Sequence, residues 1–497
     1  MLKHLELRRD VYYDSVVLFQ ASSQLRELDG IDECLVAMAT ELNIRLLHDL
    51  GFKSEDTDDT STSDLIIAVQ GESQEIIGRA IQVLDSNLES QATPRSEPDS
   101  TQIHRSLGRA VRAANANLAI ISLPGPHVAP EAADALREGT NVMIFSDGVS
   151  IKEEQKLKAL ATSHDLLVMG PDCGTAQLSG VGLGFCNDLS PGQVSIVAAS
   201  GTGAQHLSCL LDANGIGISS IIGVGGRDMS DEIGGSSTLQ ALRILDSDTS
   251  TAHIALISKP PGKKTVRRIN KIIKSLDTPV TIGLIGDPGV DLTKVAREIA
   301  TTQNLPFRKP RLKLSGAPAT GGQLIGLFSG GTLASEAAQI ITDTAGPIAG
   351  IDTFEIPTPQ AIADRKDNVI LDLGDDRMTM GRPHPMIDGT LRCKIIKELT
   401  LKPAPRLLLF DIILGFGSNP DPAGEIANAL DGFLRSHSKA RAIASVVGTS
   451  RDPQGLDQQW QTLTALGCDV YESNAEAASA IALDLLTNNG KSESTHA

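Results

Sequence analysis

An internal duplication in the C-terminal half of the chain limits its fold more than any other feature. Residues 193–212 read QVSIVAASGTGAQHLSCLLD, and residues 323–342 read QLIGLFSGGTLASEAAQIIT. Each segment joins an apolar run of strand length, a Ser-Gly turn and an amphipathic helical pattern. Three further runs recur in the same order: SSIIGVGGRD and NVILDLGDD, AHIALISKPPG and LLLFDIILGFGSNP, PVTIGLIGD and AIASVVGTSRD. Generic α/β segments can match by chance once or twice, but the shared order favours two consecutive α/β domains of one plan.

The chain ahead of the duplication divides into two smaller predicted units joined by a linker. The first alternates short strands and helices and reads as a small α/β domain, and a stretch rich in Ser, Pro and charge follows it. The second alternates apolar strands with helices, one of them opened by the capping-box pair Ser150 and Glu153, which is typical of a doubly wound, Rossmann-like sheet. The predicted boundaries are 1–88 for the small domain, 89–102 for the linker, 103–190 for the Rossmann-like domain, 191–312 and 313–490 for the two repeats, and 491–497 for a disordered tail.

The net charge of −17 disfavours a general nucleic-acid or anionic-membrane surface, because phosphate backbones and anionic lipids require clustered Lys and Arg. An anionic ligand must then be held locally, by backbone N–H groups and a few placed cations.

The six cysteines lack CxxC spacing, which argues against a zinc ribbon or a disulfide framework and fits a reducing compartment. The N-terminus has no apolar signal region, and no apolar run approaches the roughly 20 residues that span a bilayer, so a cytoplasmic location is expected.

The two Ser-Gly turns are the strongest candidates for an anion site. At each one a helix begins directly after a buried strand, so its first-turn N–H groups are unpaired and carry a partial positive charge. Glycine lets an anion approach this backbone without interference from a Cβ. A single such turn is explained equally well by a helix N-cap, but two in duplicated positions favour phosphate or carboxylate binding. The predicted phosphate-binding residues are Ser200, Gly201, Thr202, Gly203, Ser329, Gly330, Gly331 and Thr332.

Charged residues follow the next strand in each repeat. Arg227 and Arg377 are predicted to clamp the anion as bidentate cations. The predicted orienting acceptors beside them are Asp228, Asp375 and Asp376. Such Arg-Asp and Asp-Asp pairs equally often cap the helix that follows, so both interpretations stand for each residue.

The segment GRPHPMID (381–388) places a histidine between two prolines. These prolines stiffen the backbone, so the imidazole of His384 is predicted to be fixed for general acid/base work, with Arg382 as a further clamp and Asp388 as an orienting group. A histidine that is hydrogen-bonded in a rigid loop is the alternative. Lys259, at the end of a buried strand, is predicted to act as a point charge beside the phosphate. No HxH, HExxH or clustered Cys/His pattern occurs, so no protein-built transition-metal site is expected, although Mg²⁺ that accompanies a phosphate is compatible with the sequence.

The Rossmann-like domain supplies a second candidate site. Ligands on parallel sheets bind beyond the carboxyl ends of the strands. The residues at those ends are Pro124, Gly125, Ser146, Asp147, Pro171 and Asp172.

The motifs described above resemble those of a known family. MGPDCGT, SIVAASGTGAQ and IIGVGGRD look like the CoA-binding and ligase segments of the succinyl-CoA synthetase α subunit, and FSGGTLASEA looks like the ligase domain of its β subunit. More closely, the combination of MGPDCGT, ASGTG, VGGRDMSDEIGG, SKPP, GLFSGGTLA, DLGDD, GRPHPMID, GFG and GTSRDPQ resembles the FdrA family over nearly the whole chain. The resemblance implies an α/β fold with a small N-terminal α/β domain, a Rossmann-like CoA-binding-type domain and two flavodoxin-like ligase domains.

In the synthetases the two ligase domains point a pair of helix N-termini at a phosphohistidine, which implies that the two Ser-Gly turns hold a phosphate here. This sequence departs from that pattern, because residues 312–323 contain no histidine, Lys259 stands where a glutamate orients that histidine, and no ATP-grasp region is present. An acyl-phosphate pocket without the histidine relay fits these departures.

The FdrA resemblance also implies a function. It predicts a subunit of a hetero-oligomeric oxamate carbamoyltransferase in ureide breakdown, itself homodimeric or larger, which converts oxalurate and phosphate to oxamate and carbamoyl phosphate. The preorganised N–H groups of the turns would stabilise both the phosphate and the oxyanion that develops on the carbamoyl carbon. The alternatives are an acid–CoA ligase that works with a separate ATP-grasp subunit and a non-catalytic CoA-binding scaffold.

Overall fold

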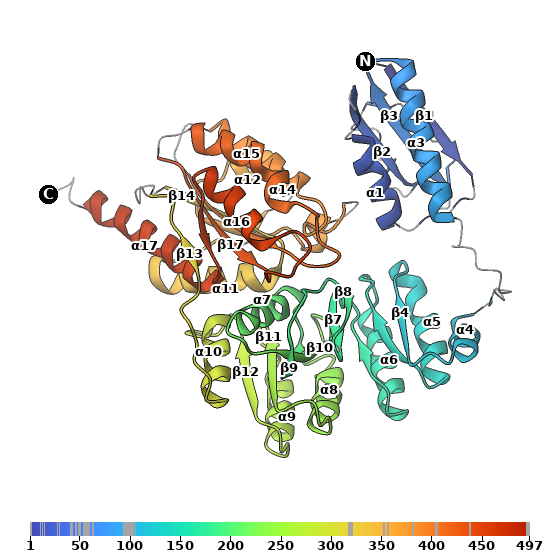
Figure 1. Ribbon diagram of the computed structural model, residues 1–497, viewed down its shortest axis with the longest axis vertical. Coiled ribbons are helices and arrows are strands. Elements are labelled where there is room, and N and C mark those ends of the chain that lie inside the picture. Colours follow the sequence, from blue (N-terminus) through green and yellow to red (C-terminus); the bar gives the residue numbers. More distant parts are fainter. Residues whose placement is uncertain are drawn as a thin grey trace. The chain divides into compact units, whose positions relative to one another are not determined.

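A computed structural model describes the chain as two compact units. One comprises residues 1–102 with 379–383, and the other comprises 103–378 with 384–497. The described residues exclude 1, 10, 12, 14, 27, 29, 40–42, 45–46, 48–50, 53–59, 62–63, 93–103, 105, 317–321, 351–352, 355–356, 380–381, 403–405, 437–438 and 494–497. Figure 1 labels many of the helices and strands of both units.

The described residues of the N-terminal unit form a three-stranded antiparallel sheet and two long helices. Its elements are β1 (Leu2–Arg8), α1 (Ser15–Arg26), β2 (Ile31–Met38), β3 (Leu65–Gly71) and α3 (Gln74–Ala92), with the strand order β1-β3-β2. The predicted small α/β domain is therefore present. Its predicted boundary at 88 is wrong, because the apolar helical spacing continues through the buried Leu84 and Leu88 and α3 ends only at Ala92. The rest of the predicted linker, 93–102, lies outside the described residues.

A parallel three-stranded sheet follows, at the start of the larger unit. Its elements are α4 (Leu107–Ala114), β4 (Leu118–Ile121), α5 (Gly125–Arg137), β5 (Asn141–Ile144), α6 (Ile151–Ser163) and β6 (Val168–Met169). Ser150 and Glu153 form the predicted capping box at the start of α6. The strands lie in sequence order, β4-β5-β6, without the reversal of a doubly wound sheet, so that part of the prediction is wrong for the described strands.

The first repeat forms the core of a six-stranded sheet. Its elements are β9 (Pro191–Ala198), α7 (Gly201–Asp212), β10 (Ile218–Gly223), α8 (Ser236–Asp246), β11 (His253–Ser258), α9 (Lys263–Ile273), β12 (Val280–Leu284) and α10 (Leu292–Thr302). The hairpin of β7 (Thr175–Leu178) and β8 (Val181–Gly184) extends the sheet to the order β12-β11-β9-β10-β7-β8. The boundary predicted at 190 is therefore wrong, because β7 pairs with β10 rather than with β6.

The second repeat forms another six-stranded sheet, with the order β13-β18-β17-β16-β14-β15. Its elements are β13 (Leu312–Lys313), β14 (Gln323–Phe328), α11 (Gly331–Ala345), α12 (Pro359–Ala363), β15 (Val369–Asp372), α13 (Asp376–Thr379), α14 (Thr390–Thr400), β16 (Arg406–Ile413), α15 (Pro422–Ser436), β17 (Arg441–Val447), α16 (Leu456–Ala465), β18 (Asp469–Tyr471) and α17 (Asn474–Glu493). The disordered tail predicted from 491 begins inside α17, and 494–497 lie outside the described residues.

The two repeats share one strand order, which confirms the duplication. In each, the parallel strands run second, first, third, fourth, and β18 adds a fifth strand in the second repeat. This is the flavodoxin-like order, in which ligands bind beside the first strand, where the order reverses. The loops after β9 and β11 and the loops after β14 and β16 therefore flank the two crevices of the fold.

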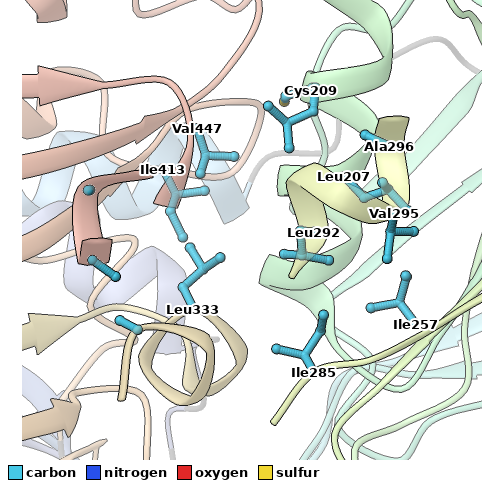
Figure 2. Packing of buried hydrophobic residues seen from close by; sticks show 14 of the residues in the cluster. Leu207, Cys209, Ile257, Ile285, Leu292, Val295, Ala296, Leu333, Ile413 and Val447 are labelled. Carbon is cyan, nitrogen blue, oxygen red and sulfur yellow. The ribbon is translucent and has the colours of Figure 1, made fainter. Parts of the chain in front are cut away.

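One hydrophobic core joins the repeats. Helix α7 is buried continuously from Thr202 to Leu211, because it lies between the two sheets rather than on a surface. Figure 2 shows side chains of this core from both repeats: Leu207, Leu292, Val295, Leu333, Ile413 and Val447. Shared burial of this kind holds the repeats in one arrangement, so the N-termini of α7 and α11 keep a defined spacing.

A polar network crosses the same core. Glu336 on α11 accepts hydrogen bonds from the Leu292 N–H at 2.6 Å and from Asn474 Nδ2 at 2.7 Å. The Asn474 N–H donates in turn to Nε2 of His206 on α7, at 3.3 Å. Burial raises the pKa of Glu336 to about 7, although the two hydrogen bonds oppose the shift.

Stability is expected to depend on pH through Glu336. Its pKa is higher in the folded chain than the ordinary 4.5, so its contribution is complete below about pH 4.5 and is lost as the pH rises to about 7. The loss is at most roughly 3 kcal/mol. Urea unfolding between pH 5 and 8 should give wild type a steeper decline than Glu336→Gln. The exposed Glu298 on α10 provides the control, because Glu298→Gln should keep the wild-type slope.

Candidate functional site

The two Ser-Gly turns lie against each other. A Cβ added to Gly330 would overlap the side chain of Thr202, and one added to Gly203 would lie 3.0 Å from Cγ2 of Thr332. The two turns are therefore neighbours, as the duplication predicted, while the anion between them stays a prediction. Their buried parts pack directly on each other, however, so the accessible residues of the two turns are Ser200, Gly201 and Gly331.

The two turns differ in what their serines do. Ser200 is the N-cap of α7 and accepts a hydrogen bond from the Gly203 N–H at 2.9 Å. Ser329 is buried beneath α11, whose N-cap is Gly330 without a side-chain capping bond. The first turn uses its Gly203 N–H for its own cap, whereas the equivalent Leu333 N–H of the second turn has no acceptor within the described part of the chain. The Gly201 and Thr202 N–H groups and those of Gly331 and Thr332 likewise have none there. The second turn is the better anion site.

Two charged side chains meet at Gly331. A Cβ on Gly331 would lie 2.6 Å from Nζ of Lys259 and would overlap Oδ2 of Asp372. Lys259 follows β11 in the first repeat, and Asp372 ends β15 in the second, so the contact spans the two repeats. The exposed Lys259 therefore stands at the N-terminus of α11, as the predicted point charge beside a phosphate would.

The carboxyl of Asp372 has a raised pKa. Its Oδ1 accepts a hydrogen bond from the Gly374 N–H at 2.9 Å. Burial raises the pKa of Asp372 to about 6, while Lys259 and the Gly374 N–H oppose the rise and the charges of Asp411 and Asp375 add to it. Near neutral pH this carboxyl can both give and take a proton.

His384 lies beside Gly374, close to Asp372. A Cβ on Gly374 would lie 2.9 Å from His384 Nε2, 2.9 Å from the Ser329 carbonyl oxygen and 3.2 Å from Asp372 Oδ1. The ring packs on Phe185, with centroids 5.8 Å apart, and its Nδ1 accepts the Met386 N–H at 3.3 Å. Burial lowers the pKa of His384 to about 4, so the neutral ring carries its proton on Nε2. The geometry favours a hydrogen-bond donor over the predicted proton shuttle.

A buried ion pair supports the second turn from below. Asp411 on β16 accepts the Ser329 N–H with both carboxylate oxygens, at 2.8 and 2.9 Å. Arg392 on α14 donates to Asp411 Oδ1 at 2.8 Å and to Ser329 Oγ at 2.7 Å. Both charged side chains are almost fully buried, with side-chain exposures of 4% and 0%. They fix the backbone from which the N–H groups of α11 project.

The predicted clamp at Arg227 is wrong. Its Nη2 donates to the Val149 carbonyl at 2.8 Å and pairs with Glu154 at 3.0 Å. Asp228 is fully buried and binds Lys158 Nζ at 2.8 Å, while it also accepts the N–H groups of Ser237 and Thr238 at the start of α8. Asp228 therefore caps the next helix, which was the alternative interpretation, whereas Arg227 binds residues 149 and 154 instead of an anion.

Three other predicted charged residues, Arg377, Asp375 and Asp388, are engaged with neighbours. Arg377, the predicted clamp, pairs with its neighbour Asp375 at 2.9 Å. This pairing lowers the pKa of Asp375, although burial opposes the shift. Asp376 begins α13, and its side chain lies outside the described residues. Arg382 is exposed. Asp388 accepts the Thr390 N–H at 2.7 Å and so caps α14.

The six residues predicted for a CoA-type site converge at the carboxyl ends of β4, β5 and β6. Ser146 Oγ accepts the Leu123 N–H at 2.8 Å, and the Ser146 carbonyl accepts the Asp172 N–H at 2.9 Å. A Cβ on Gly125 would overlap the backbone of Gly148. This close contact brings the loop of Pro124 and Gly125 against that of Ser146 and Asp147, with Pro171 and Asp172 adjacent.

No three His, Cys, Asp or Glu side chains among the described residues gather where they could hold a metal ion. No helix among them is both long and apolar enough to cross a bilayer.

The tight contact between the turns predicts the effect of a small substitution. Gly330 has φ −141°, which alanine adopts freely, so only the overlap with Thr202 opposes Gly330→Ala. We expect a destabilisation of about 1–3 kcal/mol in chemical unfolding, partly reversed by Thr202→Gly in a double-mutant cycle. Gly432→Ala on α15 is the control, because a Cβ there meets nothing within 4 Å. Equal stability of the two single variants would contradict the packing.

Two flavodoxin-like repeats with adjoining helix N-termini, preceded by a Rossmann-like sheet, define an α/β protein of the CoA-ligase type. A family model for a CoA-ligase matches residues 327–483, and a model for an AllF heavy metal-associated domain matches residues 1–104. The chain is 34% identical to YahF of Escherichia coli K12, an uncharacterized protein, over 94% of this chain and 96% of that one. The chain belongs to the same family as YahF.

The chain also has more distant similarities, each over a stated share of its length. A succinate–CoA ligase α subunit of Archaeoglobus fulgidus is 27% identical over 38% of this chain and 66% of its own length. The malate–CoA ligase α subunit of Methylorubrum extorquens is 27% identical over 31% of this chain and 55% of its own length. Among solved structures, an acetyl-coenzyme A synthetase of Ca. Korarchaeum cryptofilum has a TM-score of 0.31 at 16% identity and covers 81% of this chain and 90% of its own. An ATP citrate lyase of Methanothrix soehngenii has a TM-score of 0.36 at 17% identity, covering 42% of this chain and 43% of its own.

Proposed function

We propose that the chain is the subunit that binds phosphate in a phosphate-dependent carbamoyltransferase, which converts oxalurate and phosphate to oxamate and carbamoyl phosphate. The observation that carries the proposal is the convergence of Lys259, Asp372 and His384 on Gly331 and Gly374 at the N-terminus of α11. Resemblance to the FdrA family supplies the substrate, and hetero-oligomeric partner subunits are part of the proposal. The coarser function is an enzyme of the CoA-ligase type.

Each group of the site has a role in this reaction. The free N–H groups of α11 and the ammonium of Lys259 would hold the phosphate dianion and orient one oxygen toward the carbamoyl carbon. The neutral His384 Nε2–H would donate to the carbamoyl oxygen, on which negative charge develops as the phosphate oxygen attacks. The new O–C bond forms, and the C–N bond to the oxamate nitrogen breaks. The missing histidine in residues 312–323 supports direct attack by phosphate rather than a phosphohistidine relay.

The test is an assay of the full chain with candidate partner subunits. Carbamoyl phosphate formation that requires both oxalurate and inorganic phosphate is expected. Absence of this product from every mixture, together with a thioester made from an acid, ATP and CoA, would overturn the proposal.

Similarity to succinate–CoA ligase α subunits favours the second candidate, an acid–CoA ligase completed by a separate ATP-grasp subunit. In that case the loops at Ser146 and Asp172 would hold CoA. The same assay separates the two candidates, because only the ligase consumes ATP and CoA.

A further inference from the structure

Asp372 is an acidic side chain at the N-terminus of α11, where the proposed phosphate would bind. Its Oδ2 points at the α11 N-terminus beside Gly331, and this oxygen has no hydrogen-bond partner within the described part of the chain. Its Oδ1 is fixed by the Gly374 N–H. The carboxyl is therefore held in one orientation, with one oxygen free to meet a ligand.

The charged groups around Asp372 leave its Oδ2 atom available to a ligand. The groups that face it are Lys259 after β11, Asp375 in its own loop, Asp411 on β16 and His384 beyond Gly374. Asp375 pairs with Arg377 and Asp411 pairs with Arg392, so these two acids are compensated. His384 is neutral at pH 7 because burial lowers its pKa to about 4. Lys259 is then the cation that a phosphate and an ionised Asp372 would have to share.

A phosphate dianion at Gly331 and an ionised Asp372 carboxylate would repel each other. Phosphate should therefore bind more tightly when this carboxyl is protonated. We propose that Asp372 is the proton-relay residue of this site, which takes up a proton as phosphate binds and delivers it to the leaving oxamate nitrogen. The inference rests on the proposed function for its second step. Burial supports the first step, because it already raises the pKa of Asp372 to about 6.

The relay balances in atoms and charge. The phosphate oxygen forms the O–C bond, and the electron pair of the breaking C–N bond goes to the oxamate nitrogen. The proton on Asp372 Oδ2 moves to that nitrogen and completes the amide of oxamate. The hydroxyl proton of the attacking hydrogen phosphate then returns to the Asp372 carboxylate, so the turnover neither consumes nor releases a proton.

Calorimetric titration of the full chain with sulfate between pH 5.5 and 8 tests the proton uptake. Sulfate keeps its two charges over this range, so any pH dependence belongs to the protein. Wild type is expected to lose affinity by up to about tenfold per pH unit above pH 6, whereas Asp372→Asn should bind equally at all values. Glu298→Gln, which changes an exposed acid on α10, should keep the wild-type slope. Inorganic phosphate, titrated in parallel, should show the same difference between wild type and Asp372→Asn.

The possible failures can be told apart. If neither sulfate nor phosphate binds any variant, the proposed phosphate site is wrong and the relay with it. If both bind, but wild type and Asp372→Asn share one pH dependence, only the relay is wrong.

In the reconstituted reaction Asp372→Asn should lower kcat by about 100-fold or more and remove the decline of kcat with rising pH. Normal turnover with a normal pH profile would also overturn the relay.

Discussion

Replacing Lys259 by alanine is expected to lower kcat/KM for phosphate by about 100- to 1,000-fold in the reconstituted reaction, because it removes a charged group aimed at the transferring oxyanion. The ammonium lies at Gly331, next to N–H groups that supply only partial charges. Loss of Lys259 also removes the cation that holds down the pKa of Asp372, so this carboxyl should stay protonated to a higher pH. Sulfate binding should weaken in parallel with activity.

Lys263 is the matched control for this experiment. It is exposed at the start of α9, four residues after Lys259 and beyond two prolines, and no ion pair involves it among the described residues. Lys263→Ala removes the same charge from the same surface and should change kcat/KM by less than about twofold. Lys259→Arg should restore part of the activity, because a cation returns without the compact geometry of the ammonium. Equal losses in Lys259→Ala and Lys263→Ala would mean that a general surface potential, not a placed charge, attracts the phosphate.

The duplication in the sequence predicted the part of the fold that matters most for the site. Apolar strand runs followed by Ser-Gly turns are local patterns, and local patterns identified β9, β14 and the helices that follow them. Lys259 could also be selected, because it ends a buried strand in the same repeat. Pairing between strands is not local, so the sequence placed the β7–β8 hairpin in the wrong sheet.

The charged residues were predicted less well, because their partners come from distant parts of the chain. Arg227 was predicted to bind an anion, yet it pairs with Glu154 on α6, which no pattern near Arg227 indicates. Asp372 was missed because DLGDD offers three carboxylates, and the first of them reads as the end of a strand. A carboxylate within the apolar run LLLFDIIL was a usable signal for Asp411, since a buried charge requires a partner. That Arg392 is this partner depends on the packing of α14 against β16, which the sequence does not contain.

Replacing Arg392 by leucine is expected to destabilise the chain by about 3–5 kcal/mol, because it leaves the charge of Asp411 buried without a partner. The side chains of this pair are 4% and 0% exposed, and their atoms are 2.8 Å apart. Burial already raises the pKa of Asp411 above its ordinary value, and Arg392 is the main force against this rise. Without Arg392 the folded-state pKa rises further, so the folded chain retains a proton that the unfolded chain releases. The deficit should therefore be larger at pH 8 than at pH 5 in urea unfolding.

Arg435 supplies the comparison, because it also pairs with an aspartate at 2.8 Å but on the surface of α15, where its side chain is 80% exposed. Arg435→Leu should cost no more than about 0.5 kcal/mol at either pH. Combining Arg392→Leu with Asp411→Asn should be less damaging than the sum of the single changes, since the amide removes the unpaired charge and still accepts the Ser329 N–H. If Arg392→Leu and Arg435→Leu cost the same, or if the deficit does not grow with pH, the ion pair does not support the second turn. In that case the position of the α11 N–H groups must depend on the apolar packing of β14 and β16 alone, and the phosphate site would tolerate loss of the pair.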